Sequence, residues 1–521
     1  MDQDVFQSPR VRYSGFLPLA VALWVLAACS TVPKHSHTLS AAQAAYIQWT
    51  AEPEDEMASR AYRRSLAQLV EWFAALPMDR RIAACREAGL EIEIDSFPGT
   101  DPRHFIVADR VPRGRLKHVY KRPGVGVPVV AWRPNDGSDR RDALRPPEGL
   151  TRPATAVLDR GPSGRWRLRL LSPDRHEAVT LAGRERPLAA DFTAPIAVIV
   201  RRAEALRRSA FSGMLNSAAS VRREKLYLID PYDPKRIPLL MVHGLQSTPV
   251  SFANLSNDLA ADPEIRRRYQ IWHYHYPTGT PVLLNAATFR HVLKRTLGEI
   301  DPEGDDFATN NLVVIGHSMG GILTHTLTCN SSYKLWDNVI AARPETLPAT
   351  PSSEVTVNDV FLFRRETRVR RVIFICVPHR GSVLADNWIG DLGQGLFRGD
   401  VRVTDAFVPL MSGHRSKIAP FLARLLDEKK LSSIRTLSGR SPALMALAEI
   451  PSAVPFHSII GQVRPGPAHR GSDGVVAYSS SHLDGAESEL IVRHGHEAFQ
   501  HPDAVAEIKR ILRNHSENAR R

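Results

Sequence analysis

The sequence predicts an α/β protein whose larger part is built on a mostly parallel, doubly wound sheet with helices on both faces. From about residue 225 onward, short apolar runs rich in β-branched residues alternate with longer segments of helical periodicity. This alternation is typical of a parallel sheet, because each return between parallel strands needs a crossover helix. The chain has 521 residues, of which 43% are hydrophobic and 24% are charged. It is therefore long enough for more than one domain with a sizeable core.

The elements of this larger part can be placed from their local patterns. Apolar and β-branched runs predict strands at 237–244, 269–276, 311–318, 369–379, 455–463 and 487–495. Helical periodicity predicts helices around 252–261, 282–300, 319–327 and 502–515. We therefore assign residues 225–515 to one α/β domain.

Residues 41–224 have a different texture and predict an N-terminal α+β region. The segment 62–76 places Leu66, Leu69, Val70 and Phe73 at the i, i+3, i+4, i+7 spacing of an amphipathic helix. Further along, short apolar or alternating runs separated by Pro and Gly predict strands at 124–132, 154–158 and 166–171. The sequence does not define the order of these strands.

The N-terminus has the pattern of an export signal. Arg10 and Arg12 precede an apolar run from Phe16 to Ala28, which has 13 residues. A membrane span needs about 20 residues, whereas a secretory h-region has about this length. An ordinary signal peptide or a core segment is the alternative interpretation.

The run ends in "LAAC", residues 26–29, which resembles the lipobox of bacterial lipoproteins. The resemblance implies a signal peptide at 1–28 and lipidation of Cys29, followed by a polar tether at 29–40. It also implies attachment to a membrane of the bacterial cell envelope, since more than one acyl chain gives stable anchoring. Ser30 favours the outer membrane, with the protein facing the periplasm.

Charge and cysteine content exclude several classes of function. The net charge is +13, but the arginines are scattered and form no basic tract that alternates with aromatics, which argues against nucleic-acid binding. The scattered arginines are better explained by attraction of the protein surface to anionic lipid, or by an ordinary solvated surface. Cys85, Cys329 and Cys376 form neither a disulfide framework nor a metal-binding pattern, and we expect buried apolar thiols. We expect no metal and no cofactor.

A Gly-x-Ser-x-Gly pattern in "VVIGHSMGGIL" makes Ser318 the candidate nucleophile. The pattern matters because it lies between a predicted strand and a predicted helix, where a sharp turn lifts the serine hydroxyl out of the sheet. A Cβ at Gly316 or Gly320 would crowd such a turn, and Gly321 lets the helix approach the sheet closely. The alternative is an ordinary tight-turn serine.

A serine needs a base to remove its proton, and candidates follow downstream in the order acid, then histidine. Asp473 lies just beyond the strand at 455–463, and His496 just beyond the strand at 487–495. Both therefore fall at the carboxyl ends of strands, where the active sites of open α/β sheets lie. The alternatives are Asp484 as the acid, Asp473 as a turn residue, and a neighbouring histidine at 482, 494 or 501.

Backbone N–H groups can form an oxyanion hole beside Ser318. The strand at 237–244 ends in His243-Gly244, so that the N–H of Leu245 is one candidate donor. The N–H of Met319, next to the serine, is the other. We read His243 and His317 as structural or supporting, and His379 and Arg380 as lining the pocket or holding a turn.

These motifs together resemble the α/β-hydrolase superfamily and, within it, bacterial lipase-like and esterase-like members. The resemblance rests on "LLMVHGL", "VVIGHSMGG", "VPHRGS", "SDGVV" and "GHEAF" and spans roughly residues 225–515. "DPYDPKRIPLLMVHGLQSTP" and "YPTGTP" are similar to segments of envelope lipoproteins. The resemblance implies Ser318 as nucleophile, His496 as general base and Asp473 as the acid that orients it.

The resemblance implies a membrane-anchored serine hydrolase that cleaves a carboxyl ester, a small molecule or a lipid, through an acyl-enzyme. The alternatives are an acyltransferase on the same fold and a non-enzymatic envelope-binding lipoprotein. The long segment between Ser318 and Asp473 suggests a cap insertion over roughly residues 331–450, and ordinary core helices are the alternative. The apolar side chains that such a cap would use are Trp336, Phe361, Phe363, Trp388, Leu392 and Phe397. The oligomeric state is left open.

Overall fold

The computed structural model describes residues 35–97, 99–211, 224–346, 356–382, 415–427 and 433–520. The predicted signal peptide and Cys29 lie outside these residues. Within them, no helix has both the length and the apolar character that a membrane span requires. The tether predicted up to residue 40 is wrong in its second half, because helix α2 (His35–Ala51) begins inside it. The alanine-rich sequence that follows favours helix strongly enough to extend it backwards over this polar stretch.

The chain divides into two compact units, Met1–Glu93 with Leu158–Leu168, and Ile94–Val157 with Arg169–Arg521. The first unit contains α2, α3 (Glu56–Ala75) and α4 (Arg81–Glu87). The predicted helix at 62–76 corresponds to α3, which buries its apolar stripe. The ring of Trp49 stacks on that of Tyr62 at 4.9 Å, and the Tyr62 hydroxyl donates to the Leu158 carbonyl at 3.1 Å. A separate boundary at residue 224 stays a prediction.

The N-terminal β-structure consists of short, partly antiparallel strands. Five strands form a sheet in the order β1-β6-β5-β4-β2. Their bounds are Leu90–Ile94 (β1), His104–Val107 (β2), Val127–Arg133 (β4), Leu150–Arg160 (β5) and Trp166–Leu171 (β6). The three predicted strands overlap β4, β5 and β6 and are confirmed, although the first was predicted from residue 124 and β4 begins at Val127. Two small antiparallel pairs are formed by β3 (Lys121–Arg122) with β9 (Ala190–Asp191) and by β7 (Ala178–Leu181) with β8 (Arg184–Pro187). The helix α5 (Ala194–Phe211) comes next in the chain.

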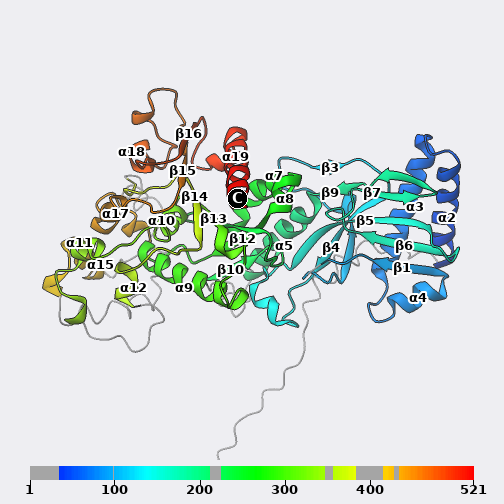
Figure 1. The fold of residues 1–521 in the computed structure, drawn as a ribbon, viewed down its shortest axis with the longest axis horizontal. Coiled ribbons are helices and arrows are strands. Elements are labelled where there is room, and N and C mark those ends of the chain that lie inside the picture. The colour runs from blue at the N-terminus through cyan, green and yellow to red at the C-terminus, as the bar shows by residue number, and fades with distance from the viewer. Residues whose placement is uncertain are drawn as a thin grey trace, which may run out of the picture. The chain divides into compact units, whose positions relative to one another are not determined.

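The α/β part is built on a seven-stranded sheet in the order β10-β12-β11-β13-β14-β15-β16 (Figure 1). Only β10 pairs antiparallel, and each later pair is parallel. The strands are Lys225–Leu228 (β10), Ile237–Val242 (β11), Tyr269–His275 (β12), Leu312–His317 (β13), Val369–Ile375 (β14), Phe456–Gly461 (β15) and Ser488–Val492 (β16). The six predicted strands are confirmed, whereas β10 was missed because four residues carry too little periodicity.

Successive residues of the central strands face two different cores. Leu240 and Val242 pack with α9 (Val282–Ile300) and α10 (Met319–His325) in one apolar cluster. Their neighbours Leu239 and Met241 pack in a second cluster. The helices of that second face are α7 (Ala253–Ala260), α8 (Pro263–Arg268) and α19 (Pro502–Asn518). A sheet covered on both faces needs strands that are apolar throughout, which is what the sequence shows.

The predicted cap insertion falls partly outside the described residues, and so do Trp388, Leu392 and Phe397. The described parts include α11 (Lys334–Val339), α12 (Val357–Phe361), α15 (Pro420–Asp427) and α17 (Pro442–Ala448). Trp336 and Phe361 are buried in the same cluster as α9 and α10, and Phe363 packs against it. These three aromatics therefore belong to the core, as in the alternative interpretation.

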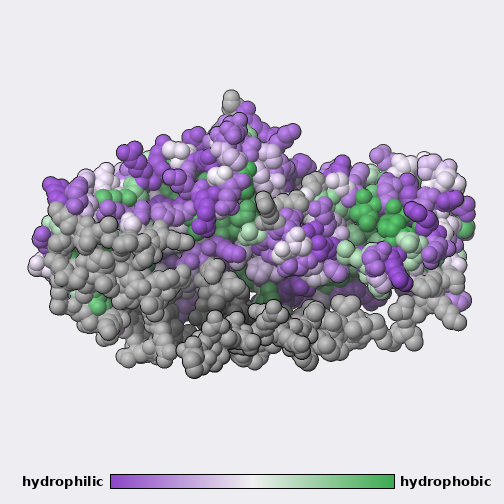
Figure 2. Space-filling view, turned by 90° about the horizontal axis from the view of Figure 1, so that it is seen from below, coloured by the Kyte–Doolittle hydropathy of each residue, from purple (hydrophilic) through white to green (hydrophobic). Residues whose placement is uncertain are grey.

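The surface is broadly hydrophilic in the view of Figure 2, where apolar side chains appear as smaller patches among the described residues. Scattered charges produce such a surface, and the sequence distributes its arginines in this way.

Candidate active site

Ser318 lies in a sharp turn between β13 and α10. Its backbone has φ of 54° and ψ of −130°, a conformation that non-glycine residues rarely adopt. The surrounding glycines make the turn possible. A Cβ at Gly316 would lie 2.6 Å from the Gly321 Cα, and one at Gly320 would lie 2.4 Å from the Val242 carbonyl oxygen. The turn thus has the strained strand-to-helix form expected from the sequence.

The structure brings Ser318, His496 and Asp473 together by two short hydrogen bonds. His496 Nδ1 lies 2.7 Å from Asp473 Oδ2, and His496 Nε2 lies 2.8 Å from Ser318 Oγ. A carboxylate only accepts, so Nδ1–H donates to Asp473. In the neutral ring, Nε2 is then left to accept the Ser318 hydroxyl proton. The arrangement can take a proton from Ser318 and stabilise the resulting imidazolium.

Asp473 is held in its ionised form although it is almost completely buried. Its Oδ1 accepts from the N–H groups of Val475 at 2.7 Å and Val476 at 2.6 Å. Burial raises the pKa of Asp473, but the hydrogen bond from His496 and the two backbone donors outweigh burial and lower the pKa below 3.8. Asp473 is therefore a carboxylate at neutral pH.

The other acid and histidines considered from the sequence lie in other networks. Asp484 has a side chain that is 97% exposed and contacts His482 at 3.2 Å. A hydrogen bond with Glu489 raises the pKa of His482. His501 accepts from the Asp503 N–H at the start of α19, and the His494 ring lies beside the Gly495 carbonyl. None of these side chains has a hydrogen bond to Ser318 among the described contacts.

The predicted oxyanion loop lies directly against the serine. A Cβ on Gly244 would be 2.7 Å from the Ser318 Cβ and 3.2 Å from its Oγ. Leu245 follows in this loop, and Met319 is the first residue of α10, where an N–H has no acceptor within the helix. Both N–H groups thus belong to segments that adjoin Ser318.

The side chain of His243 holds the oxyanion loop and does not take part in the triad. Its ring stacks on Tyr276 at 4.5 Å, and the Tyr276 hydroxyl donates to the His243 carbonyl at 2.6 Å. Burial lowers the pKa of His243 to about 3, so the ring is neutral and its Nδ1–H donates to the Gly244 carbonyl at 3.0 Å. This agrees with the supporting role expected from the sequence.

His317 fixes the backbone of the candidate base. Its Nε2–H donates to the His496 carbonyl at 2.9 Å, and the two rings lie 4.9 Å apart. Burial lowers the pKa of His317 to about 3, so no positive charge competes with the one that His496 takes up. His317 is therefore a positioning residue next to the nucleophile.

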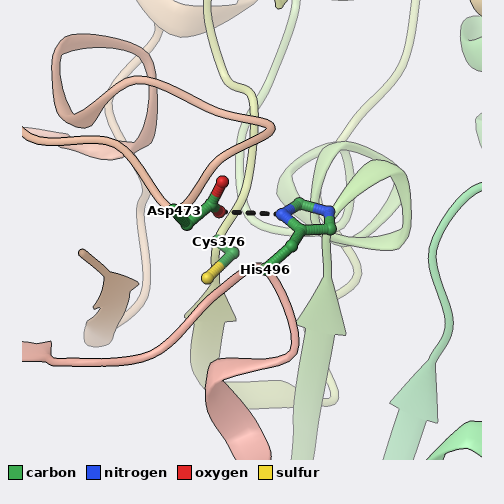
Figure 3. A group of neighbouring side chains, drawn as sticks. All are labelled: Cys376, Asp473 and His496. Atoms are coloured by element: carbon green, nitrogen blue, oxygen red, sulfur yellow. Dashed lines mark hydrogen bonds and ion pairs between the residues drawn. The ribbon is translucent and has the colours of Figure 1, made fainter. Parts of the chain in front are cut away.

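Cys376 is a member of the site that the sequence did not reveal. It follows β14 with φ of 49°, and it is buried. Figure 3 shows it next to Asp473 and His496, and one ligand-type atom of each of the three lies within 4.8 Å of the others. Burial and the adjacent Asp473 raise its pKa well above 9.0, so the thiol is protonated. A metal ion would have to displace that proton and the Asp473–His496 bond, and we assign none here.

His379 and Arg380 hold a turn and do not contact the triad through any described hydrogen bond. The His379 ring is buried against Phe374 at 4.8 Å. Arg380 Nη1 donates to the carbonyls of Ser479 at 2.9 Å and His482 at 2.6 Å. Of the two roles that the sequence left open for His379 and Arg380, the contacts therefore favour holding a turn.

The architecture and the site together define an α/β-hydrolase fold. A mostly parallel sheet with helices on both faces places Ser318 on a strand-to-helix turn, and Asp473 and His496 follow in the chain order expected of that fold. All three lie beyond the carboxyl ends of strands in one sheet.

Comparisons with solved structures find matches of low similarity. The chain resembles a lipase of Bacillus licheniformis, BlEst2 in its mature form, with 16% identity over 55% of this chain and 97% of that one, at a TM-score of 0.33. It resembles an inhibited esterase B of Lactobacillus rhamnosis with 12% identity over 60% and 96%, at a TM-score of 0.31. A lipase-esterase related protein of Clostridium acetobutylicum gives 15% identity over 55% and 98%, at a TM-score of 0.28. No family model and no curated protein matches the chain.

Proposed function

We propose that this protein is a serine hydrolase that cleaves carboxyl esters, with Ser318 as nucleophile, His496 as general base and Asp473 as its orienting acid. The observation that carries the proposal is the continuous hydrogen-bonded chain of these three side chains, with contacts of 2.8 Å and 2.7 Å. Burying such a hydrogen-bonded chain costs free energy, because it needs a strained serine backbone and a desolvated carboxylate. Its presence therefore supports a functional role.

The reaction follows from the positions of these groups. Ser318 Oγ attacks the ester carbonyl carbon while its proton passes to His496 Nε2. The carbonyl oxygen gains negative charge and accepts hydrogen bonds from the N–H groups of Leu245 and Met319, each worth about 2.7–4 kcal/mol. His496 then protonates the leaving alcohol oxygen as the carbon–oxygen bond breaks. Water, deprotonated by His496, then attacks the acyl carbon; the bond from that carbon to Ser318 Oγ breaks, His496 returns the proton to this oxygen, and the acid is released.

A fluorophosphonate probe and a screen of ester chain lengths test this function. Wild type should react with the probe at Ser318 and hydrolyse at least one acyl ester, whereas Ser318→Ala should lose both. Ser479→Ala is the matched control, because this exposed serine uses only its backbone carbonyl in a described contact. A folded wild type that neither reacts nor hydrolyses any ester would support the envelope-binding alternative instead.

Acyl transfer on the same site is the second candidate. An alcohol or amine acceptor can take the place of water at the acyl-enzyme, because His496 would deprotonate either nucleophile in the same way. Product analysis with and without an added alcohol separates the two. A new ester that forms at the expense of free acid would favour the transferase.

We also propose that lipidation of Cys29 anchors the protein to a membrane of the bacterial cell envelope, on the periplasmic side of the outer membrane. Support comes from the short apolar run, the lipobox-like "LAAC" and Ser30 after the cysteine. Incorporation of an alkynyl fatty acid into wild type but not into Cys29→Ser, together with membrane fractionation, tests this. Equal labelling of both proteins would contradict it.

A further inference from the structure

A cavity of about 290 Å³ lies apart from the candidate active site. One wall is α5, whose residues Ile196, Ile199, Val200 and Ala203 line it at i, i+3, i+4, i+7 spacing. The core contact of α5 is made by Ala194, Ala197 and Val198. The stripe therefore forms a second apolar face, which lines the cavity. None of the triad residues lines this cavity.

The opposite wall belongs to the α/β part of the same compact unit. Val250 and Leu259 come from the segment before and within α7, Ile265 from α8, and Ile271 from β12. Helices α5 and α7 are in contact beside the cavity (Figure 1). The space is partly open to the surface and its lining is mostly apolar, which is the general form of a small-molecule site.

The charged residues at the cavity are already paired with one another. Arg152 and Arg236 both contact Asp230, the latter at 3.2 Å. Arg266 Nε lies 2.7 Å from Asp174. These arginines therefore leave little net positive charge for an anionic ligand.

Three further titratable groups at the cavity also favour an uncharged occupant. Burial raises the pKa of Glu148 above 4.5 and lowers the pKa of His273 to about 4. Burial raises the pKa of Tyr227 to about 12. His273 and Tyr227 are thus neutral at pH 7, and a ligand carboxylate near Glu148 would meet a like charge or a carboxyl that resists ionisation.

We propose that this cavity binds a single uncharged aliphatic chain, such as the alkyl or acyl chain of a lipid. An apolar cavity of about 150 Å³ stays dry and binds benzene, and ligand pockets begin at about 300 Å³. The volume and the apolar walls suit a flexible hydrocarbon, and the internal charge pairs exclude a charged head group. This binding site is independent of the ester hydrolysis proposed above.

Photocrosslinking in the full, membrane-reconstituted protein tests the site. The probe is a decanol that carries a diazirine on its chain, applied after Ser318 has been blocked with a fluorophosphonate. Crosslinks should map to peptides containing residues 196–203 and 250–271. Unlabelled decanol should compete for them, and decanoate should compete much less.

Two positions on α5 give a matched pair of variants. Ala203→Trp places an indole in the cavity and should lower crosslinking by about tenfold or more. Ala205→Trp, on the exposed side of the same helix, should leave it unchanged. Ala260→Leu fills the opposite wall more gently and keeps the test informative if Ala203→Trp does not fold. Circular dichroism and the midpoint of thermal unfolding report whether each variant is folded.

Three results would overturn the proposal. They are equal crosslinking in wild type and in a folded cavity-filling variant, crosslinks confined to peptides around Ser318, and competition by decanoate as strong as that by decanol. Absence of ester hydrolysis and of fluorophosphonate labelling in folded wild type would not affect any of them, so failure of this proposal can be told from failure of the proposed function.

Discussion

Two buried carboxylates, one in each half of the molecule's sequence, share almost the same surroundings but differ in their partner. Asp191 is 1% exposed and Asp473 is 2% exposed. In each, Oδ1 accepts two backbone N–H groups, from Thr193 and Ala194 or from Val475 and Val476. In each, Oδ2 accepts a short hydrogen bond, from Arg113 Nη2 at 2.6 Å or from His496 Nδ1 at 2.7 Å, and Lys121 Nζ also lies 3.8 Å from Asp191 Oδ2.

The partner decides whether the buried carboxylate supports structure or chemistry. A guanidinium keeps its proton at any ordinary pH, so Arg113 and Asp191 form a permanent ion pair. An imidazole can accept and return a proton in the course of a reaction, so His496 can take the Ser318 proton beside a fixed negative charge. Only in the second pair does the nitrogen-bearing side chain make a further hydrogen bond to a hydroxyl, with 2.8 Å between His496 Nε2 and Ser318 Oγ. Removal of Asp473 should therefore affect mainly the rate of reaction, and removal of Asp191 mainly the free energy of unfolding.

The largest expected effect is that of Asp473→Asn on the rate of reaction. The amide cannot stabilise an imidazolium and favours the wrong tautomer of His496, so we expect kcat/KM to fall by about 10⁴-fold. The unfolding free energy should change much less, because Asn keeps an acceptor for the Val475 and Val476 N–H groups. Ester hydrolysis and the rate of fluorophosphonate labelling measure the effect.

Asp484→Asn is the control for this variant, because the sequence alone leaves Asp484 as a rival acid. Its side chain is exposed, so its removal should leave kcat/KM unchanged. If both variants lost kcat/KM equally, the loss could not be assigned to the position of Asp473, and the comparison with Asp191 would fail.

Asp191→Ala should have the converse effect, a loss of stability without a loss of rate. Removing one partner of a buried pair leaves Arg113 and two N–H groups without their acceptor, which typically costs about 3–5 kcal/mol of unfolding free energy. Denaturant unfolding measures this, and labelling of Ser318 at low temperature should remain at the wild-type rate. Asp109→Ala, which removes a 74% exposed carboxylate beside Lys121, should leave stability nearly unchanged.

The sequence predicts the candidate catalytic carboxylate, Asp473, better than it predicts Asp191. Ser318, Asp473 and His496 stand next to recognisable motifs at strand ends, so their meeting follows from the parallel sheet. Asp191 carries no motif. Cys376 was missed for a related reason: it meets Asp473 and the Gly461 N–H because β14 and β15 are neighbours in the sheet. The cavity depends on the volume left between α5 and the sheet, which no short pattern encodes.

The relay also depends on how closely α10 approaches the sheet, and Gly321→Ala tests this. A Cβ there would lie 2.0 Å from a Val377 methyl carbon, so we expect a loss of about 1–3 kcal/mol in unfolding free energy and slower labelling of Ser318. Adding the second substitution Val377→Ala should restore part of the lost unfolding free energy and part of the lost rate of Ser318 labelling. Gly298→Ala in α9, where a Cβ meets nothing within 4 Å, should instead stabilise by about 0.5–1 kcal/mol.

The smallest expected effect is a pH dependence of stability that arises from Asp473 itself. Its pKa lies below the unfolded value near 3.8, so the folded state binds its proton less readily than the unfolded state does. The stabilisation is fully present above that value and is lost as the pH falls through the lower folded pKa. Unfolding of wild type and Asp473→Asn should therefore differ most above about pH 5, and the difference should shrink towards about pH 3. A difference that grows on acidification would mean that burial outweighs the hydrogen bonds, and that Asp473 lacks the fixed charge on which the comparison with Asp191 rests.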